Sequence, residues 1–177
     1  MQKNVHLRKM VICAIMIAMQ IILSRYVGIQ TPYVQTSFGF VPVAVTSAVC
    51  GPVYGAMCAF ISDFLGVVLA GTNVYSPLFT INYVLYALFY AFFLYKKERS
   101  IKNIVLSVVL QTVLVAIPLT PLWLYVYYNF VLETPKAFEL MSVQQMIVRF
   151  IEVPIKIVTL IPVCRYLLPK LEKNILH

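Results

Sequence analysis

Long apolar segments separated by short polar ones dominate this chain. A transmembrane helix needs about 20 predominantly apolar residues, with shorter stretches possible where helices are broken. By that standard the pattern predicts six spans, near residues 10–24, 38–50, 53–71, 79–95, 104–125 and 143–168. We therefore predict an all-α fold, an integral membrane six-helix bundle that forms a single domain over residues 1–177.

Composition strengthens the membrane assignment. The chain is 62% hydrophobic and only 11% charged, whereas soluble domains are about 45–50% apolar and about 25% charged. No hydrophilic stretch is long enough for a nucleotide-binding domain, so any energy source must come from a partner chain. The net charge of +8 is explained by basic helix ends, and no nucleic-acid partner is expected.

The distribution of basic residues predicts the orientation in the bilayer. Ten of the fourteen lie in three clusters, before the first span, between the fourth and fifth, and at the end of the sixth: Lys3, Arg8, Lys9, Lys96, Lys97, Arg99, Lys102, Arg165, Lys170 and Lys173. With six spans these clusters share one side. Because basic residues favour the cytoplasmic side, we predict that both termini are cytoplasmic. The opposite loops carry aromatic and amide side chains, which predicts a ligand cavity that opens to the outside.

Ionisable groups inside the spans are the next signal, because each carries a free-energy cost near hydrocarbon. Arg149, Glu152 and Lys156 are spaced three and four apart and so share one face of the sixth helix. They form either a structural ion-pair ladder or a site where Arg149 keeps surplus charge for an anionic ligand. Asp63 is the one acid of the third helix, and we expect neighbouring hydroxyls such as Ser62 to satisfy it. Arg25 is either an interface anchor or a second carboxylate partner.

Two further patterns concern packing. Ala14 and Ala18 lie four residues apart in the first helix, a spacing that lets another helix approach closely. The four cysteines lie within apolar runs and lack CxxC spacing, so we expect buried small side chains. His6 and His177 are terminal, and no metal site is predicted.

These features together resemble the substrate-capture subunits, or S components, of energy-coupling factor (ECF) vitamin transporters. The resemblance is carried by the AxxxA pattern and by SFGFVPVAVTSAVCGPVYGAMCAFISDFLG over residues 37–66, while the preceding SRYVGIQTPYVQTSFGF is similar to the folate type. It implies a subunit without catalytic activity in the plasma membrane of a prokaryote. The subunit would dock, through Ala14 and Ala18, on a transmembrane coupling protein that carries two cytoplasmic ATPases. ATP would be used only by those partners, and this chain would need no cofactor.

The candidate site residues suit folate on chemical grounds. A pterin is flat and edged with hydrogen-bonding groups, so it requires stacking rings and amides, and its glutamate tail requires cations. The candidates for substrate binding are Arg25, Gln35, Phe38, Tyr75, Asn82, Tyr83, Trp123 and Arg149. The alternatives are an S component for another vitamin, of pantothenate or pyridoxine type, and a small intramembrane enzyme that uses Asp63 or Glu152 as acid or base.

Overall fold

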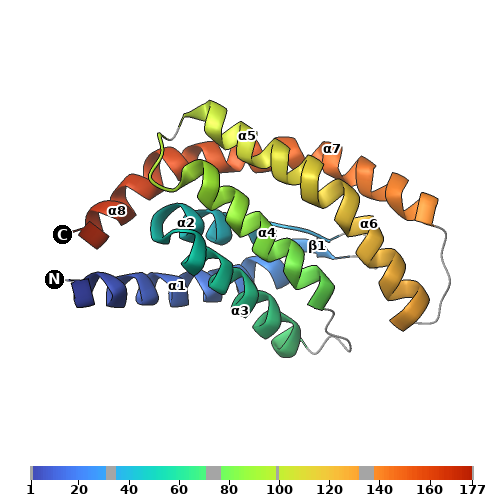
Figure 1. Ribbon diagram of the computed structural model, residues 1–177, viewed down its shortest axis with the longest axis horizontal. Helices are drawn as coiled ribbons and strands as arrows, with labels where there is room; N and C mark the ends of the chain where they lie inside the picture. The colour runs from blue at the N-terminus through green and yellow to red at the C-terminus, as the bar shows by residue number, and fades with distance from the viewer. Residues whose placement is uncertain (1, 31–34, 71–76, 99, 132–137, 177) are drawn as a thin grey trace.

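The computed structural model describes residues 2–30, 35–70, 77–98, 100–131 and 138–176, and it is dominated by helices (Figure 1). The elements are α1 (Gln2–Arg25), β1 (Gly28–Gln30), β2 (Gln35–Ser37), α2 (Phe40–Cys50), α3 (Pro52–Ala70), α4 (Pro77–Leu94), α5 (Ile101–Gln111), η1 (Thr112–Ala116), α6 (Ile117–Val126), η2 (Tyr127–Val131), α7 (Phe138–Pro162), η3 (Val163–Leu167) and α8 (Leu168–Leu176). The π-helical segment η1 joins α5 and α6 into one rod, and η3 joins α7 to α8. The rods therefore number six, and the helical bundle that the sequence predicts is confirmed.

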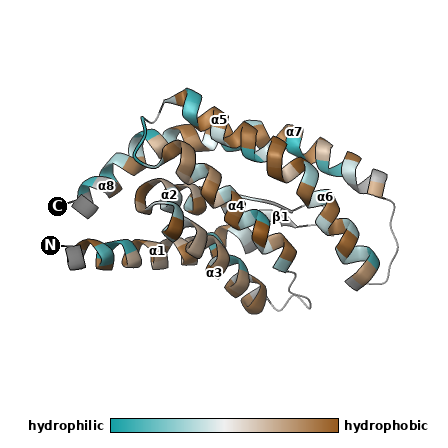
Figure 2. Ribbon diagram, in the orientation of Figure 1, coloured by the Kyte–Doolittle hydropathy of each residue, from teal (hydrophilic) through white to brown (hydrophobic). Residues whose placement is uncertain are grey.

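Within the described ranges, four helical segments are long and apolar enough to cross a membrane: Val5–Ser24, Pro52–Leu69, Pro77–Leu94 and Ile101–Phe130. Apolar residues make up most of the helices, while hydrophilic ones gather on α8 and near the start of α5 (Figure 2). Large side chains such as Phe150 and Leu69 are 77% and 71% exposed. A surface of this kind fits a lipid environment, and it identifies an integral membrane protein.

Helix α2 is the centre of the bundle. It packs against α1, α3, α4, α7 and α8, and nine of its eleven residues, from Pro42 to Cys50, are buried. At about 1.5 Å per residue it is only about 16 Å long, roughly half the hydrocarbon thickness. The second predicted span is therefore a short core helix around which the longer helices stand.

The turn between α2 and α3 depends on two glycines. Gly51 has a φ of 99°, in the left-handed region, and an added Cβ would lie 3.1 Å from the Tyr95 ring. Pro52 then opens α3, so the GPxxG motif forms the tight turn that its residues predict. Gly55, one turn later, lets α3 approach α2, because a Cβ there would lie 2.3 Å from Ser47 Oγ and 2.9 Å from Ser47 Cα.

A short strand pair accompanies the helical fold. The segment between the first two predicted spans contains the antiparallel strands β1 and β2, with Gly28 opposite Ser37 and Gln30 opposite Gln35. Pairing of this kind satisfies backbone N–H and C=O groups that neither helix reaches. The strands follow the C-terminal end of α1 and lead the chain back into α2.

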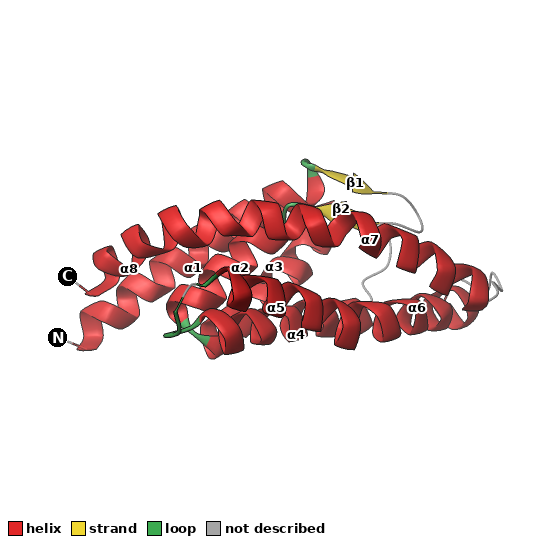
Figure 3. Cartoon of the chain, turned by 90° about the horizontal axis from the view of Figure 1, so that it is seen from above, coloured by secondary structure: helices red, strands yellow, loops and turns green. Residues whose placement is uncertain are grey.

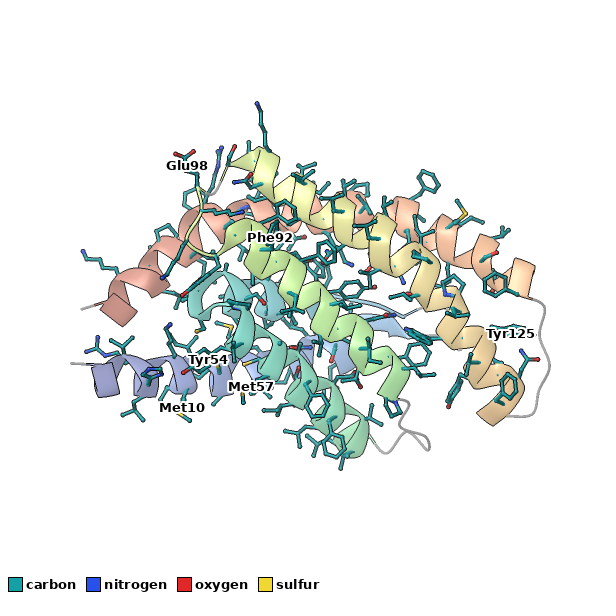
Figure 4. All side chains as sticks on the ribbon, viewed as in Figure 1. Met10, Tyr54, Met57, Phe92, Glu98 and Tyr125 are labelled. Carbon is teal, nitrogen blue, oxygen red and sulfur yellow. The ribbon has the colours of Figure 1, made fainter. Side chains whose placement is uncertain are left out.

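The two ends of the bundle differ in what they carry. The N- and C-termini lie at the same end, and the turn between α4 and α5 lies toward that end as well (Figures 1 and 3). Glu98, in that turn, and Tyr125, in α6, lie toward opposite ends of the molecule (Figure 4). The basic clusters therefore gather at one end and the tyrosine-rich end of α6 lies at the other.

Two of the π-helical segments, η1 and η3, are each followed by a proline. Pro118 lacks the N–H that Leu114, four residues earlier in η1, would accept. Widening the helix by one residue per turn relieves the clash between a proline ring and the preceding turn. Pro169 stands in the same relation to Arg165 in η3. The fifth and sixth predicted spans therefore contain π-helical turns within continuous rods.

Candidate functional site

The inward face of α7 carries a buried charged triad, which we define as Arg149, Glu152 and Lys156. One oxygen of Glu152, Oε2, contacts Arg149 Nη1, and the other, Oε1, lies 2.8 Å from Lys156 Nζ. Their side chains are 12%, 8% and 7% exposed, respectively. Removing either partner of a buried ion pair leaves an uncompensated charge, so the three side chains hold one another in place.

The two cations of the triad have different surroundings. Lys156 Nζ lies 5.4 Å from the ring centroid of Tyr86 and 5.7 Å from that of Phe40, so Glu152 and two aromatic faces surround it. Arg149 donates from Nη2 to Gln145 Oε1 at 3.2 Å. Its buried Nε has no hydrogen-bond partner among the residues that the structure describes. Of the two cations, the arginine is thus the one with a buried nitrogen that has no hydrogen-bond partner in the described part of the chain.

A second polar cluster joins α4 to α6. Trp123 Nε1 donates to Asn82 Oδ1 at 3.0 Å, and Asn82 Nδ2 donates to Thr120 Oγ1 at 3.4 Å. Tyr86 lies one helical turn after Asn82 on the same face of α4. Asn82 is only 4% exposed, so these bonds orient both ends of its amide.

Tyrosines of α4 connect the two clusters. The rings of Tyr83 and Tyr86 meet edge to face, with centroids 6.3 Å apart. Tyr86 also faces the triad, since its ring centroid lies 5.4 Å from Lys156 Nζ. The result is a layer of aromatic rings, an amide and cations on α4, α6 and α7, groups that suit a flat aromatic ligand with an acidic substituent.

The structure brings together four of the predicted substrate-binding residues: Asn82, Tyr83, Trp123 and Arg149. Phe38 is one ring removed, since it packs on Phe40 with centroids 6.2 Å apart, and Phe40 lies beside Lys156.

The other candidates are placed less fully. Tyr75 lies outside the described residues. Arg25 ends α1 and Gln35 begins β2, but their side chains are also outside the described part. Ala14 and Ala18 are exposed on α1.

One predicted partner is wrong. Asp63 accepts a hydrogen bond from Thr80 of α4 at 2.6 Å, and the expected Ser62 hydroxyl instead donates to the carbonyls of Cys58 and Ala59 in its own helix. Serine in a helix commonly bonds to the carbonyl four residues earlier, so the Ser62 hydroxyl does not donate to Asp63. The expectation that a hydroxyl satisfies the acid is confirmed, with a threonine from the neighbouring helix in that role.

Sequence reasoning missed Thr120, Gln145 and Tyr86 as parts of the site. Gln145 precedes Arg149 by four residues and Tyr86 follows Asn82 by four, so helical periodicity could have found both. Thr120 stands between Pro118 and Pro121, where a π-helical segment disturbs the periodicity, and no local signal identifies it.

Comparison with known proteins agrees with this arrangement. The family model described as "ECF transporter, substrate-specific component" matches residues 8–164. A relative from Clostridium novyi (strain NT), described as folate transporter FolT, is 33% identical over 146 residues, which cover 82% of this chain and 81% of the relative. A second, of the same description, from Leuconostoc mesenteroides subsp. mesenteroides, is 27% identical over 123 residues, or 69% of this chain and 66% of that one.

A solved structure, the crystal structure of FolT bound with folic acid, superposes with a TM-score of 0.77 at 30% sequence identity. The match covers 86% of this chain and 88% of the other. Sequence and fold thus agree over nearly the whole length, and the chain belongs to the family of substrate-specific components of ECF transporters.

Proposed function

We propose that this protein is the high-affinity folate-binding subunit of an ATP-driven ECF vitamin uptake transporter. The observation that carries the proposal is the layer of Asn82, Tyr83, Trp123 and Arg149, in a fold similar to that of FolT bound with folic acid. The layer supplies rings for stacking, an oriented amide for a pterin edge, and a cation for a carboxylate.

Different residues of this site bind different parts of the ligand. Tyr83 and Phe38 stack on the pterin, and Asn82 and Gln35 read its hydrogen-bonding edge. Tyr75 and Trp123 complete the aromatic lining. Arg149 and Arg25 bind the glutamate tail, where each charge-assisted hydrogen bond contributes about 1.5–3 kcal/mol.

We infer the orientation from the two ends of the bundle and the partners from the family. We place both termini, which lie at one end together with the turn between α4 and α5 (Figure 3), in the cytoplasm of a prokaryote. The ligand cavity opens at the opposite end. The chain itself performs no chemical reaction and holds no cofactor. A transmembrane coupling protein and two cytoplasmic ATPases supply the energy.

The direct test is to purify the protein from cells in detergent and examine it for a co-purified pterin by absorbance and mass. Titration of ligand-free protein with folate, pantothenate and pyridoxine then ranks the vitamins. We expect saturable folate binding without turnover. Tight binding of another vitamin with none of folate would contradict the proposal.

The proposed docking of this subunit on the coupling protein through Ala14 and Ala18 is tested separately. Ala14 and Ala18 are exposed on α1 next to large apolar side chains, among them Val11 and Ile15, which are 52% and 53% exposed. Replacing both alanines by leucine should abolish folate uptake by cells yet leave folate binding to the purified subunit intact, because bulk blocks close helix approach. The matched control is Val158→Leu, at a 70% exposed position of α7. Loss of binding as well would place the alanines inside this subunit.

A further inference from the structure

The charged triad holds an unequal number of charges. Arg149 and Lys156 contribute two positive charges and Glu152 contributes one negative charge, so one positive charge is in surplus. The whole sequence has only six acidic residues. Of the described acids, Glu152 is the one that forms an ion pair with either of these cations.

The surroundings of the two cations indicate which of them can offer the surplus positive charge to a ligand. Lys156 is enclosed by Glu152 Oε1 at 2.8 Å and by the rings of Phe40 and Tyr86. Arg149 contacts Glu152 Oε2 and Gln145 but keeps a buried Nε without a partner among the described residues. It also lies seven residues nearer the start of α7, about two helical turns closer to the end where the ligand enters.

We propose that Lys156 is a positioning residue for anion binding, which acts without touching the ligand. By sharing the single carboxylate of Glu152, it prevents that carboxylate from neutralising Arg149 completely. The surplus charge of the triad therefore resides on Arg149, where it binds one carboxylate of the ligand.

Charge counting gives a specific consequence. If Lys156 becomes neutral, Arg149 and Glu152 form a balanced pair and no surplus remains for the ligand. If Lys156 and Glu152 are both made neutral, Arg149 alone carries one positive charge, and the surplus returns. A loss that a second neutralising substitution repairs distinguishes charge balance from simple packing.

The inference rests on the proposed function, because it assigns a role to Lys156 in binding the acidic tail of folate. The probes are folate and 6-hydroxymethylpterin, a pterin without the acidic tail. Dissociation constants are measured for the wild type, Lys156→Met, Lys156→Arg and the double variant Glu152→Gln/Lys156→Met. Lys173→Met, which removes a cation from an exposed position of α8, is the matched control.

We expect Lys156→Met to weaken folate by about tenfold to a hundredfold, the range of one charge-assisted hydrogen bond. The same variant should change the affinity for 6-hydroxymethylpterin less than about threefold. Lys156→Arg and the double variant should bind folate within about fivefold of the wild type, because both keep one surplus charge on the triad.

Three outcomes overturn the inference: an unchanged folate affinity in Lys156→Met, equal losses for both pterins, or a double variant as weak as the single one. If Lys156→Met fails to fold, the double variant is the deciding measurement. Loss of folate binding in that variant, with binding of the tail-less pterin retained, would show that a lone positive charge on Arg149 is not enough to bind the tail. Failure of the wild type to bind folate would contradict the proposed function instead.

Discussion

Helices α2 and α7 are both packed into the bundle, but by opposite means. In α2 nearly every residue is buried and almost all are apolar or small, with Thr46 bonded to a carbonyl of its own helix. In α7 the buried face carries Glu152 and Lys156 while Phe150 and Ile151, 77% and 64% exposed, point outward. In a bundle surrounded by lipid, apolar side chains are stable on the outside as well as in the core, so the core need not be entirely apolar. A charge buried in such a bundle costs free energy, and its presence indicates a functional role.

The largest effect should come from breaking the charge pairing of α7. Glu152→Gln leaves Arg149 and Lys156 without a counter-charge in the interior, which should reduce the free energy of unfolding by about 3–5 kcal/mol. Denaturant unfolding in detergent micelles measures it, with Glu98→Gln, at an exposed position, as control. A loss below about 1 kcal/mol would mean that water reaches the triad.

The functional side of the comparison is tested at Arg149. Arg149→Ala leaves Glu152 and Lys156 as a balanced pair, so the fold should survive, while folate should bind about 1.5–3 kcal/mol more weakly. The tail-less pterin should be little affected in the same titration. Equal losses for the two ligands would assign Arg149 to the structural ladder.

The apolar side of the comparison is tested at Gly55. Gly55→Ala places a methyl group 2.3 Å from Ser47 Oγ and 2.9 Å from Ser47 Cα, so α2 and α3 must separate, at a cost of about 1–3 kcal/mol of stability. Thermal unfolding measures the loss, and Met57→Ala, at a 55% exposed position of α3, is the control. Adding Ser47→Gly should recover part of the stability, and if it does not, the helices do not pack through this contact.

The smallest effect is expected at Trp123. Trp123→Phe removes the N–H that donates to Asn82 Oδ1 and should cost about 1 kcal/mol of folate binding. In an Asn82→Leu background the same substitution should have no further effect, because the hydrogen bond is already absent. Additive losses in this double-mutant cycle would show that the two side chains act independently.

Most of the fold could be predicted because lipid imposes a length and a polarity on every span. The six rods, the turn at Gly51 and the shared face of Arg149, Glu152 and Lys156 all follow from local sequence. The hydrogen bond from Thr80 to Asp63 joins residues seventeen apart in different helices, and periodicity carries no information about it. The β1–β2 pairing lacked a sequence signal for the same reason, since it depends on backbone groups rather than on side chains.

The residue types of the site could be predicted from the sequence, but the hydrogen bonds that join them could not. Costly residues such as Arg149 and Asn82 could be recognised individually because each is out of place in an apolar helix. The hydrogen bonds of Asn82 with Thr120 and Trp123 depend on how α4 faces α6. That facing is a tertiary contact between residues about forty positions apart, and it cannot be read from spacing.

The placement of all three charges of the triad on one helix also bears on how the protein is made. A charged residue at the centre of a helix that enters the bilayer costs about 2.5–3.5 kcal/mol. Because Glu152 pairs with Arg149 at i−3 and with Lys156 at i+4, α7 carries within itself the counter-charge for one of its two cations. Inserting α7 into the membrane therefore costs less free energy than inserting three separate charges would.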